Sequence, residues 1–374
     1  MQSIAFHAKQ IMKMILQCVV LPLTYGFWRV IYGFQKPELI ILADAHHDSM
    51  PFSLQRMEAQ LEKRGCRVTK YIRNYSKMSV QGAALSAMGF MRLYAQAKYV
   101  FICDNFLPVV SCKKRKETKV IQLWHACGVM KKMGYDAADD IPHYYRASVY
   151  RNYDLVTVSA PESAYFFCGA MRLSEQIVRP LGVSRTDFYF DPTWIAQCKA
   201  DFYRQHPQAK GKTVILWAPT FRGNAEAPYL VGAEDILALE AQLGEDYYFL
   251  YKVHPHIETH THLSNCAILT ERLLPVADLM ITDYSSVLYD FMFFKKPLVL
   301  YAPDFHEYDA ARGLYLSYET LSPFICKTSR TLLQTVKAAL EQKEQQHTLC
   351  RQRYLSACDG NATARILQTI HLDG

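Results

Sequence analysis

Short apolar runs rich in β-branched residues alternate along this chain with stretches of helical periodicity, and this alternation constrains the fold more than any other feature. Strands are predicted at 39–43, 67–72, 99–103, 120–124 and 155–159, and then at 213–218, 247–253, 279–282 and 298–301. Helices are predicted at 53–64, 81–96, 161–171, 233–243, 286–294 and 332–345. Strands that alternate with helices form mostly parallel sheets, so the sequence predicts an α/β protein with two Rossmann-like halves.

The length of 374 residues fits two domains, and half of the residues are apolar, which suffices for two cores. We predict a membrane-associated segment at 1–34, a first domain at 35–190 and a second at 191–374. The crossover is expected within 182–207, where Pro192 and Pro207 bound a short helical piece.

The net charge of +7 suits nucleic acid, anionic lipid headgroups or phosphorylated substrates. No interleaving of aromatic and basic residues supports nucleic-acid binding. The basic run at 113–119 is either a solvated loop or a membrane-facing patch. The 11 cysteines include no Cys-x-x-Cys pair, so a reducing cytoplasm is predicted and a disulfide framework is not.

Fifteen uncharged residues, 14–28, lie near the N-terminus. They are fewer than the ~20 that span a bilayer, and Pro22 and Gly26 are expected to interrupt them. No small-residue cleavage site follows, so a signal peptide is not predicted. We predict an interfacial helix with Trp28 at the membrane boundary. The alternative is a helix packed on the protein's own surface.

His125 directly follows the predicted strand 120–124, and Gly128, Lys131 and Lys132 come soon after. A histidine at the end of a strand can accept a proton from a hydroxyl nucleophile. His254 has the same position in the second half, so both could serve one site. The alternatives are structural histidines and, for the histidine-rich tract 254–262, a metal site, although no ligand spacing matches a known motif.

The predicted strand 279–282 meets a helix through hydroxyl-bearing residues, among them Asp283, Ser285 and Ser286. Free N–H groups at a helix start bind phosphate, although a simple serine N-cap explains the pattern as well. Thr220 and Arg222 follow the strand 213–218, where an arginine can bind a diphosphate or form a surface salt bridge. No glycine-rich phosphate loop is present, which disfavours an ATPase or an NAD enzyme.

Six motifs in this order resemble the CDP-glycerol glycerophosphotransferase family of teichoic acid synthesis: WHACGVMKKMG, WAPTFR, KVHPH, ITDYSSVLYDF, YAPDFHEYDAARGLY and DGNATARI. They cover the chain from about Val120 onward. The resemblance implies a GT-B architecture, a donor held mainly by the second domain, no required cofactor, and peripheral or monotopic attachment to the cytoplasmic face of the bacterial cell membrane. Ala126 and Cys127 depart from the commonest motif and put the acceptor in doubt.

The resemblance also implies roles for individual residues. His125 is similar to the family's base and His254 to its second essential histidine. The expected donor-phosphate residues are Thr220, Arg222, Thr282, Asp283, Ser285, Ser286, Arg312 and Gly313, and the expected acceptor-side residues are Gly128, Lys131 and Lys132.

The expected reaction moves glycerol phosphate from CDP-glycerol to a hydroxyl of an undecaprenyl-diphosphate-linked saccharide and releases CMP. The short chain resembles the priming enzymes. CDP-ribitol as the donor, a GT-B glycosyltransferase or 2-epimerase, and a non-catalytic envelope-assembly protein are the alternatives. The sequence does not choose between glycerol and ribitol.

Overall fold

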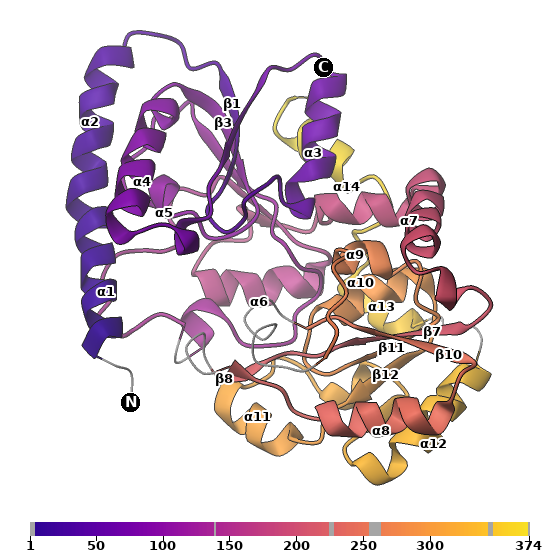
Figure 1. The fold of residues 1–374 in the computed structure, drawn as a ribbon. Coiled ribbons are helices and arrows are strands. Elements are labelled where there is room, and N and C mark those ends of the chain that lie inside the picture. Colours follow the sequence, from indigo (N-terminus) through magenta and orange to yellow (C-terminus); the bar gives the residue numbers. More distant parts are fainter. Residues whose placement is uncertain (1–3, 138–139, 224–227, 254–262, 343–346, 373–374) are drawn as a thin grey trace. The chain divides into compact units, whose positions relative to one another are not determined.

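The computed structural model describes residues 4–137, 140–223, 228–253, 263–342 and 347–372 (Figure 1). It contains two compact units. Unit 1 comprises Met1–His125, Met133–Asp187 and Ala357–Gly374, and unit 2 comprises Ala126–Lys132 and Phe188–Ser356. The chain thus leaves unit 1 close to the predicted boundary at 190. Two exchanges were not predicted, because long-range packing decides them: 126–132 joins unit 2, and the C-terminal residues return to unit 1.

Unit 1 is built on a six-stranded parallel sheet in the order β2-β1-β3-β4-β5-β6. The strands are Leu39–Asp44 (β1), Val68–Ile72 (β2), Ala97–Ile102 (β3), Lys119–Gln122 (β4), Leu155–Thr157 (β5) and Val178–Arg179 (β6). The sequence predicted all of them except β6, which is too short to show a periodicity. The main helices after the N-terminal segment are Phe52–Lys63 (α3), Val80–Tyr94 (α4), Leu107–Val110 (α5), Pro161–Met171 (α6) and Ala362–Thr369 (α14).

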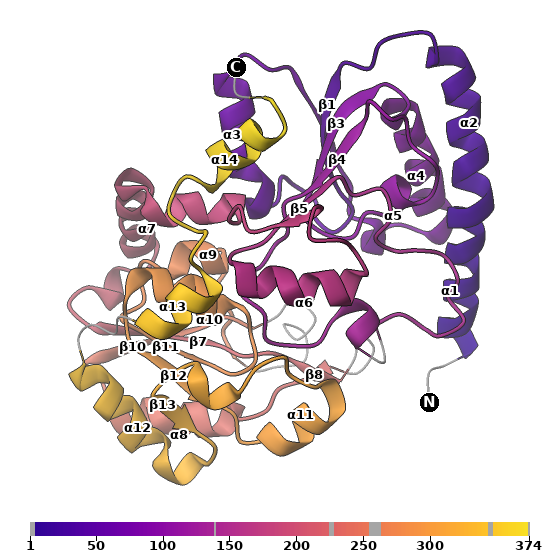
Figure 2. The ribbon, with the colours of Figure 1, turned by 180° about the vertical axis from the view of Figure 1, so that it is seen from behind.

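Helix α14 lies beside α3 in both views, although more than 290 residues separate them in the sequence (Figures 1 and 2). Ile366 and Leu367 are fully buried in the core that α3 shares with the sheet. The Asp187 carboxylate accepts hydrogen bonds from the backbone N–H groups of Ala362 and Thr363, both at 2.9 Å. An apolar face and an N-terminal carboxylate therefore fix the C-terminal return.

The N-terminal segment forms one continuous helical rod alongside α4 (Figure 1). It consists of Ile4–Ile15 (α1), a π-helical turn at Leu16–Val20, and Leu21–Tyr32 (α2). The prediction that Pro22 and Gly26 interrupt it is wrong. Pro22 lies in the first turn of α2, directly after the π turn, where proline is tolerated. Within the described residues, His7–Tyr32 is long and apolar enough to cross a membrane.

One face of this rod is fixed to unit 1. Gln17, Leu21 and Tyr25 are buried. The Gln17 side chain donates to the Ser148 carbonyl at 2.7 Å and accepts a hydrogen bond from the Tyr145 hydroxyl at 2.5 Å. A buried amide satisfied on both sides holds the rod in one rotational setting.

The basic run 113–119 also holds the rod. The buried Arg115 guanidinium donates to the carbonyl oxygens of Gln35 at 2.8 Å and Tyr32 at 3.3 Å, at the end of α2. Lys114 pairs with Asp154 at 2.9 Å, and the other lysines of the run are exposed. Part of the basic run therefore has a structural role. This role was not predicted, because the sequence analysis considered only a solvated loop or a membrane-facing patch.

Unit 2 has a five-stranded parallel sheet in the order β10-β7-β11-β12-β13 and a short antiparallel pair, β8 and β9. The strands are Thr213–Ala218 (β7), Arg222–Gly223 (β8), Pro228–Tyr229 (β9), Tyr247–Tyr251 (β10), Leu279–Thr282 (β11), Leu298–Tyr301 (β12) and Phe324–Cys326 (β13). The helices are Pro192–Gln205 (α7), Ala233–Leu243 (α8), Thr270–Leu273 (α9), Val287–Phe291 (α10), Phe305–Arg312 (α11), Ser329–Glu341 (α12) and Thr348–Tyr354 (α13).

Helices α8 and α12 cover one face of this sheet, and α9, α10 and α13 lie on the other side (Figure 2). The core under α8 and α12 contains Trp217, Ile281, Val299 and Val336, which are all buried. The sequence predicted the four longest strands of the sheet but not the three-residue edge strand β13.

Candidate active site

Each sheet has a topological switch point. In unit 1 the chain runs from β1 outward to β2 and then to β3 on the other side of β1, and in unit 2 β7, β10 and β11 repeat this order. Ligands of open α/β sheets bind beyond the carboxyl ends of the strands at such a point. The residues to consider therefore follow β1 and β3 in unit 1, and β7 and β11 in unit 2.

The turn after β11 carries the predicted phosphate-binding residues. Thr282 is buried, and its hydroxyl donates to the Ala218 carbonyl at 2.6 Å. The buried Asp283 carboxylate accepts from the backbone N–H of Thr220 at 2.8 Å, which ties the loop after β7 to this turn. Ser285 and Ser286 are partly exposed. Of the residues predicted in this turn, the two serines are thus the ones whose hydroxyls can reach a ligand.

Arg222, predicted to bind a diphosphate, has protein partners for its guanidinium group. It donates to the Asp304 carboxylate at 2.6 and 3.0 Å, to Asp283 at 3.0 Å, and to the Thr220 carbonyl at 2.5 Å. Its Cζ atom lies 4.9 Å from the centroid of the Tyr284 ring. The side chain is 7% exposed. Arg222 therefore holds the loops around the turn in place, and Asp304 is a site residue that the sequence did not indicate.

Charge pairing sets the protonation of this network. Burial by itself lowers the pKa of Arg222, but the hydrogen bond to Asp304 and the charges of both carboxylates raise it above its ordinary value. Burial by itself raises the pKa of Asp304, and its hydrogen bond with Arg222 reverses this, so the net pKa is lowered. Burial is also the main cause that raises the pKa of Tyr284. The guanidinium thus pairs with both the Asp304 and the Asp283 side chains.

The residues after His125 belong to unit 2, although they were predicted on the acceptor side. Gly128 has φ of +63°, and a Cβ atom there would lie 2.5 Å from the Tyr289 ring, so only glycine fits. The Tyr289 hydroxyl donates to the Val129 carbonyl at 2.7 Å. The Lys132 N–H donates to the Gly313 carbonyl at 3.1 Å.

Lys131 also forms a backbone bridge with Leu314. The predicted acceptor-side residues Gly128, Lys131 and Lys132 thus lie in the same unit as the predicted donor-side residues Arg312 and Gly313. The physical reason is that the chain after β4 leaves its own sheet and packs on α10 and on the loop after α11.

His125 ends the first of the three chain segments of unit 1, at the carboxyl edge of its sheet, and its side chain is 45% exposed. Its Nδ1 atom lies 3.1 Å from the carbonyl oxygen of Cys103. A carbonyl oxygen can only accept, so Nδ1 carries the proton and Nε2 of the neutral ring has a free lone pair. His254 lies outside the described residues, as does the rest of its histidine-rich tract, so its role and the metal alternative remain predictions.

The sequence analysis missed polar residues at the end of β1. The buried Asp44 carboxylate accepts from the backbone N–H groups of His46 and His47, both at 2.8 Å, and contacts His47 Nδ1 at 3.0 Å. Burial by itself raises the pKa of Asp44. The contacts with His46 and His47 lower it by more, so the net pKa is below its ordinary value. The signal was available in the sequence, because the run Asp-Ala-His-His follows a predicted strand as His125 does.

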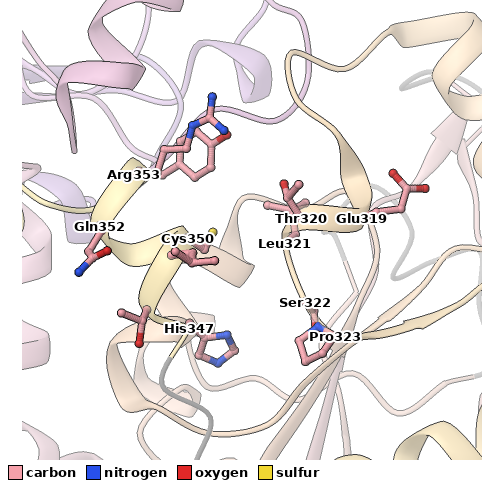
Figure 3. A pocket seen from close by; sticks show the side chains of 12 residues that line it. Glu319, Thr320, Leu321, Ser322, Pro323, His347, Cys350, Gln352 and Arg353 are labelled. Carbon is pink, nitrogen blue, oxygen red and sulfur yellow. The ribbon is translucent and has the colours of Figure 1, made fainter.

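A cavity of about 940 Å³ lies in unit 2 between residues 319–323 and α13 (Figure 3). The Ser322 hydroxyl donates to the Leu298 carbonyl at 2.6 Å, and His347 Nε2 lies 2.9 Å from the Lys296 carbonyl. Both partners lie at the amino end of β12. The cavity is therefore distinct from the switch point at the carboxyl ends, and none of the predicted site residues lines it.

Known proteins resemble the chain over most of its length. The teichoic acid ribitol-phosphate primase of Bacillus spizizenii is 29% identical over 354 residues, which are 88% of this chain and 90% of that protein. The teichoic acid glycerol-phosphate primase of Bacillus subtilis is 30% identical over 72% of this chain and 73% of that protein. The structure of the wall teichoic acid polymerase TagF covers 93% of both chains with a TM-score of 0.75 at 21% identity, which confirms the predicted GT-B fold class.

The sequence profile of a family described as CDP-glycerol:poly(glycerophosphate) glycerophosphotransferase matches residues 32–372. This match extends well beyond the part of the chain, from Val120 onward, in which the sequence analysis found the resemblance. It confirms the predicted enzyme class, a glycerophosphotransferase. The chain belongs to the CDP-glycerol:poly(glycerophosphate) glycerophosphotransferase family.

Proposed function

We propose that this enzyme transfers glycerol phosphate from CDP-glycerol to a hydroxyl of an undecaprenyl-diphosphate-linked saccharide during teichoic acid synthesis. The acceptor oxygen attacks the β-phosphorus, the bond from that phosphorus to the oxygen of CMP breaks, and a phosphodiester forms. His125 Nε2 takes the acceptor proton. The observation that carries this proposal is the hydrogen bond between His125 Nδ1 and the Cys103 carbonyl, because it leaves Nε2 free to act as the base.

The donor diphosphate is proposed to bind at the switch point of unit 2. Ser285 and Ser286 would contact it, with the Arg222 network holding their turn in place. Arg312, half-buried at the end of α11, is the proposed charged contact. His254 is proposed to contact the transferring phosphoryl group or the leaving group. A TagF structure described with CDPG supports a CDP-linked donor for the family's fold. Charge stabilisation and positioning would supply most of the acceleration.

The rod formed by α1 and α2 is proposed to lie on the cytoplasmic face of an anionic membrane. Its outer face carries exposed apolar residues at helical spacing over 19 positions: Met12, Ile15, Val19, Leu23, Phe27 and Val30. Its inner face is packed on unit 1 through Gln17, Leu21 and Tyr25. A helix with one apolar face and one protein-covered face suits insertion into the headgroup region, parallel to the bilayer. Such a placement brings a lipid-linked acceptor to the enzyme.

Ribitol phosphate is a second candidate for the transferred group. The observation that favours it is the near full-length match to the ribitol-phosphate primase, which exceeds the coverage of the glycerol-phosphate primase. Both polyol donors would leave CMP and need the same base and phosphate contacts.

The donor, the acceptor and the number of additions can be tested together. Purified enzyme is incubated with CDP-glycerol or CDP-ribitol and a synthetic disaccharide diphospholipid, and the lipid product is analysed by mass spectrometry. We expect one or a few glycerol phosphate units per lipid, with CMP released in equal amount. If product forms only from CDP-ribitol, the donor is CDP-ribitol and not CDP-glycerol. If neither donor gives a product, the proposal is refuted.

A further inference from the structure

A carboxylate faces the protonated nitrogen of His125. The Oδ2 atom of Asp104 lies 3.5 Å from His125 Nδ1, on the same side of the ring as the Cys103 carbonyl. Asp104 follows β3, and His125 follows the neighbouring strand β4. Because parallel strands end at the same edge of the sheet, the two loops meet there. Both side chains belong to unit 1 and are partly exposed, at 33% and 45%.

A buried amide joins these two loops. Gln122, at the end of β4, is fully buried. Its side-chain nitrogen donates to the Asp104 carbonyl at 3.1 Å, and its side-chain oxygen accepts from the backbone N–H of Trp124 at 3.1 Å. One side chain thus fixes the backbone on both sides of the contact between Asp104 and His125.

The backbone and ring of Trp124 further restrict His125. Trp124 has φ of +59°, a conformation that few non-glycine residues adopt and that occurs often at functional sites. Its ring stacks on the His125 ring with centroids 4.6 Å apart and packs edge-on against Phe167 at 5.1 Å. The imidazole is therefore held in one orientation before any ligand binds.

We propose that Asp104 is a positioning residue for phosphoryl transfer, whose carboxylate stabilises the positive charge that His125 acquires when Nε2 takes the acceptor proton. This inference rests on the proposed function, in which His125 is the base. In Ser-His-Asp sites the carboxylate also selects the tautomer. Here the Cys103 carbonyl already selects the tautomer. The role of Asp104 is therefore limited to the effect of its charge on His125. A carboxylate that assists a histidine in this way typically contributes on the order of ten- to a hundredfold in activity, by analogy with such pairs at metal sites.

Within the residues that the structure describes, Asp104 is the carboxylate that forms an ion-pair contact with His125. The neighbouring Cys103 thiol is buried, which raises its pKa well above the ordinary value and keeps it neutral. The other charged or titratable groups that act on Cys103 or Asp104 from neighbouring elements are Asp44, Arg185, Tyr150 and Tyr153.

The test compares Asp104→Asn, which keeps the shape and removes the charge, with Asp104→Glu, which keeps the charge. For Asp104→Asn we expect kcat to fall by roughly ten- to a hundredfold with KM for CDP-glycerol unchanged. Asp104→Glu should restore most of the kcat that Asp104→Asn loses, because a carboxylate again faces the His125 ring. Asp48→Asn is the matched control, since Asp48 follows β1 at the same sheet edge but pairs with Lys77 at 2.6 Å, and it should change kcat by less than about twofold.

Thermal melting establishes that each variant is folded, and Asp104→Ser replaces Asp104→Asn if the latter is not. An unchanged kcat in the charge-free variant, while His125→Ala is inactive, would overturn the role of Asp104 and leave the proposed base intact. Full activity of His125→Ala would instead overturn the proposed function, and the inference with it.

Discussion

The guanidinium group of Arg222 binds two carboxylates that belong to different loops. Asp283 lies in the turn after β11, and Asp304 lies after β12. A planar group with five N–H donors can serve both carboxylates and the Thr220 carbonyl at once, whereas a lysine ammonium cannot match this geometry. The loops that carry the proposed phosphate contacts are therefore organised by one side chain.

We predict that Arg222→Ala destabilises unit 2 by about 3–5 kcal/mol, because the buried Asp283 carboxylate and the half-buried Asp304 carboxylate lose their counter-charge. Arg222→Lys should lie between this variant and wild type. Arg204→Ala is the control, since the exposed Arg204 side chain pairs with Asp201 and its loss should cost at most about 1 kcal/mol. Urea denaturation followed by tryptophan fluorescence, to which the buried Trp217 of unit 2 contributes, measures the difference. Equal midpoints for Arg222→Ala and Arg204→Ala would show that the network adds no stability.

The π-helical turn of the N-terminal rod allows the helix to accommodate Pro22 without a break. The N–H of Leu21 donates to the Leu16 carbonyl, one residue further back than in an α-helix. The extra residue in this turn places Pro22 in a first turn, where a missing N–H leaves no broken bond. The rod remains continuous, so its exposed apolar residues keep a single face.

At this scale we predict that Leu23→Asp combined with Phe27→Asp reduces binding to phosphatidylglycerol vesicles by at least tenfold. Both side chains are exposed, at 70% and 60%, so their loss should not unfold the rod. Inserting such a side chain into an apolar layer is worth roughly 1.5–3 kcal/mol when it is fully buried. Leu85→Asp on α4 is the control, because Leu85 is 67% exposed but lies outside the rod. If wild type and the Leu23→Asp, Phe27→Asp double variant sediment with vesicles to the same extent, the proposed membrane face is contradicted.

Across the whole molecule, periodicity predicted the strands that form both sheets, because a strand buried on both faces leaves a continuous apolar run in the sequence. It could not predict β6 and β13, which are two and three residues long. It also could not predict the return of α14 to unit 1, since Ile366 meets a core whose other residues lie far away in the sequence.

The sequence predicted where the site residues lie but not which residues they contact. Because strand ends can be recognised in the sequence, His125 and Ser285 could be placed at the carboxyl ends of strands. Which carboxylate a charged side chain meets depends on neighbouring strands. The contacts of Arg222 with Asp304 and of His125 with Asp104 therefore required the structure.

The most direct test of the central claim is a single-turnover assay of His125→Ala with CDP-glycerol and the lipid acceptor, paired with calorimetric titration of the donor. We predict donor affinity equal to wild type and a rate of CMP release lowered by on the order of a hundred- to ten-thousand-fold. CMP release at the wild-type rate would contradict the assignment of His125 as the base.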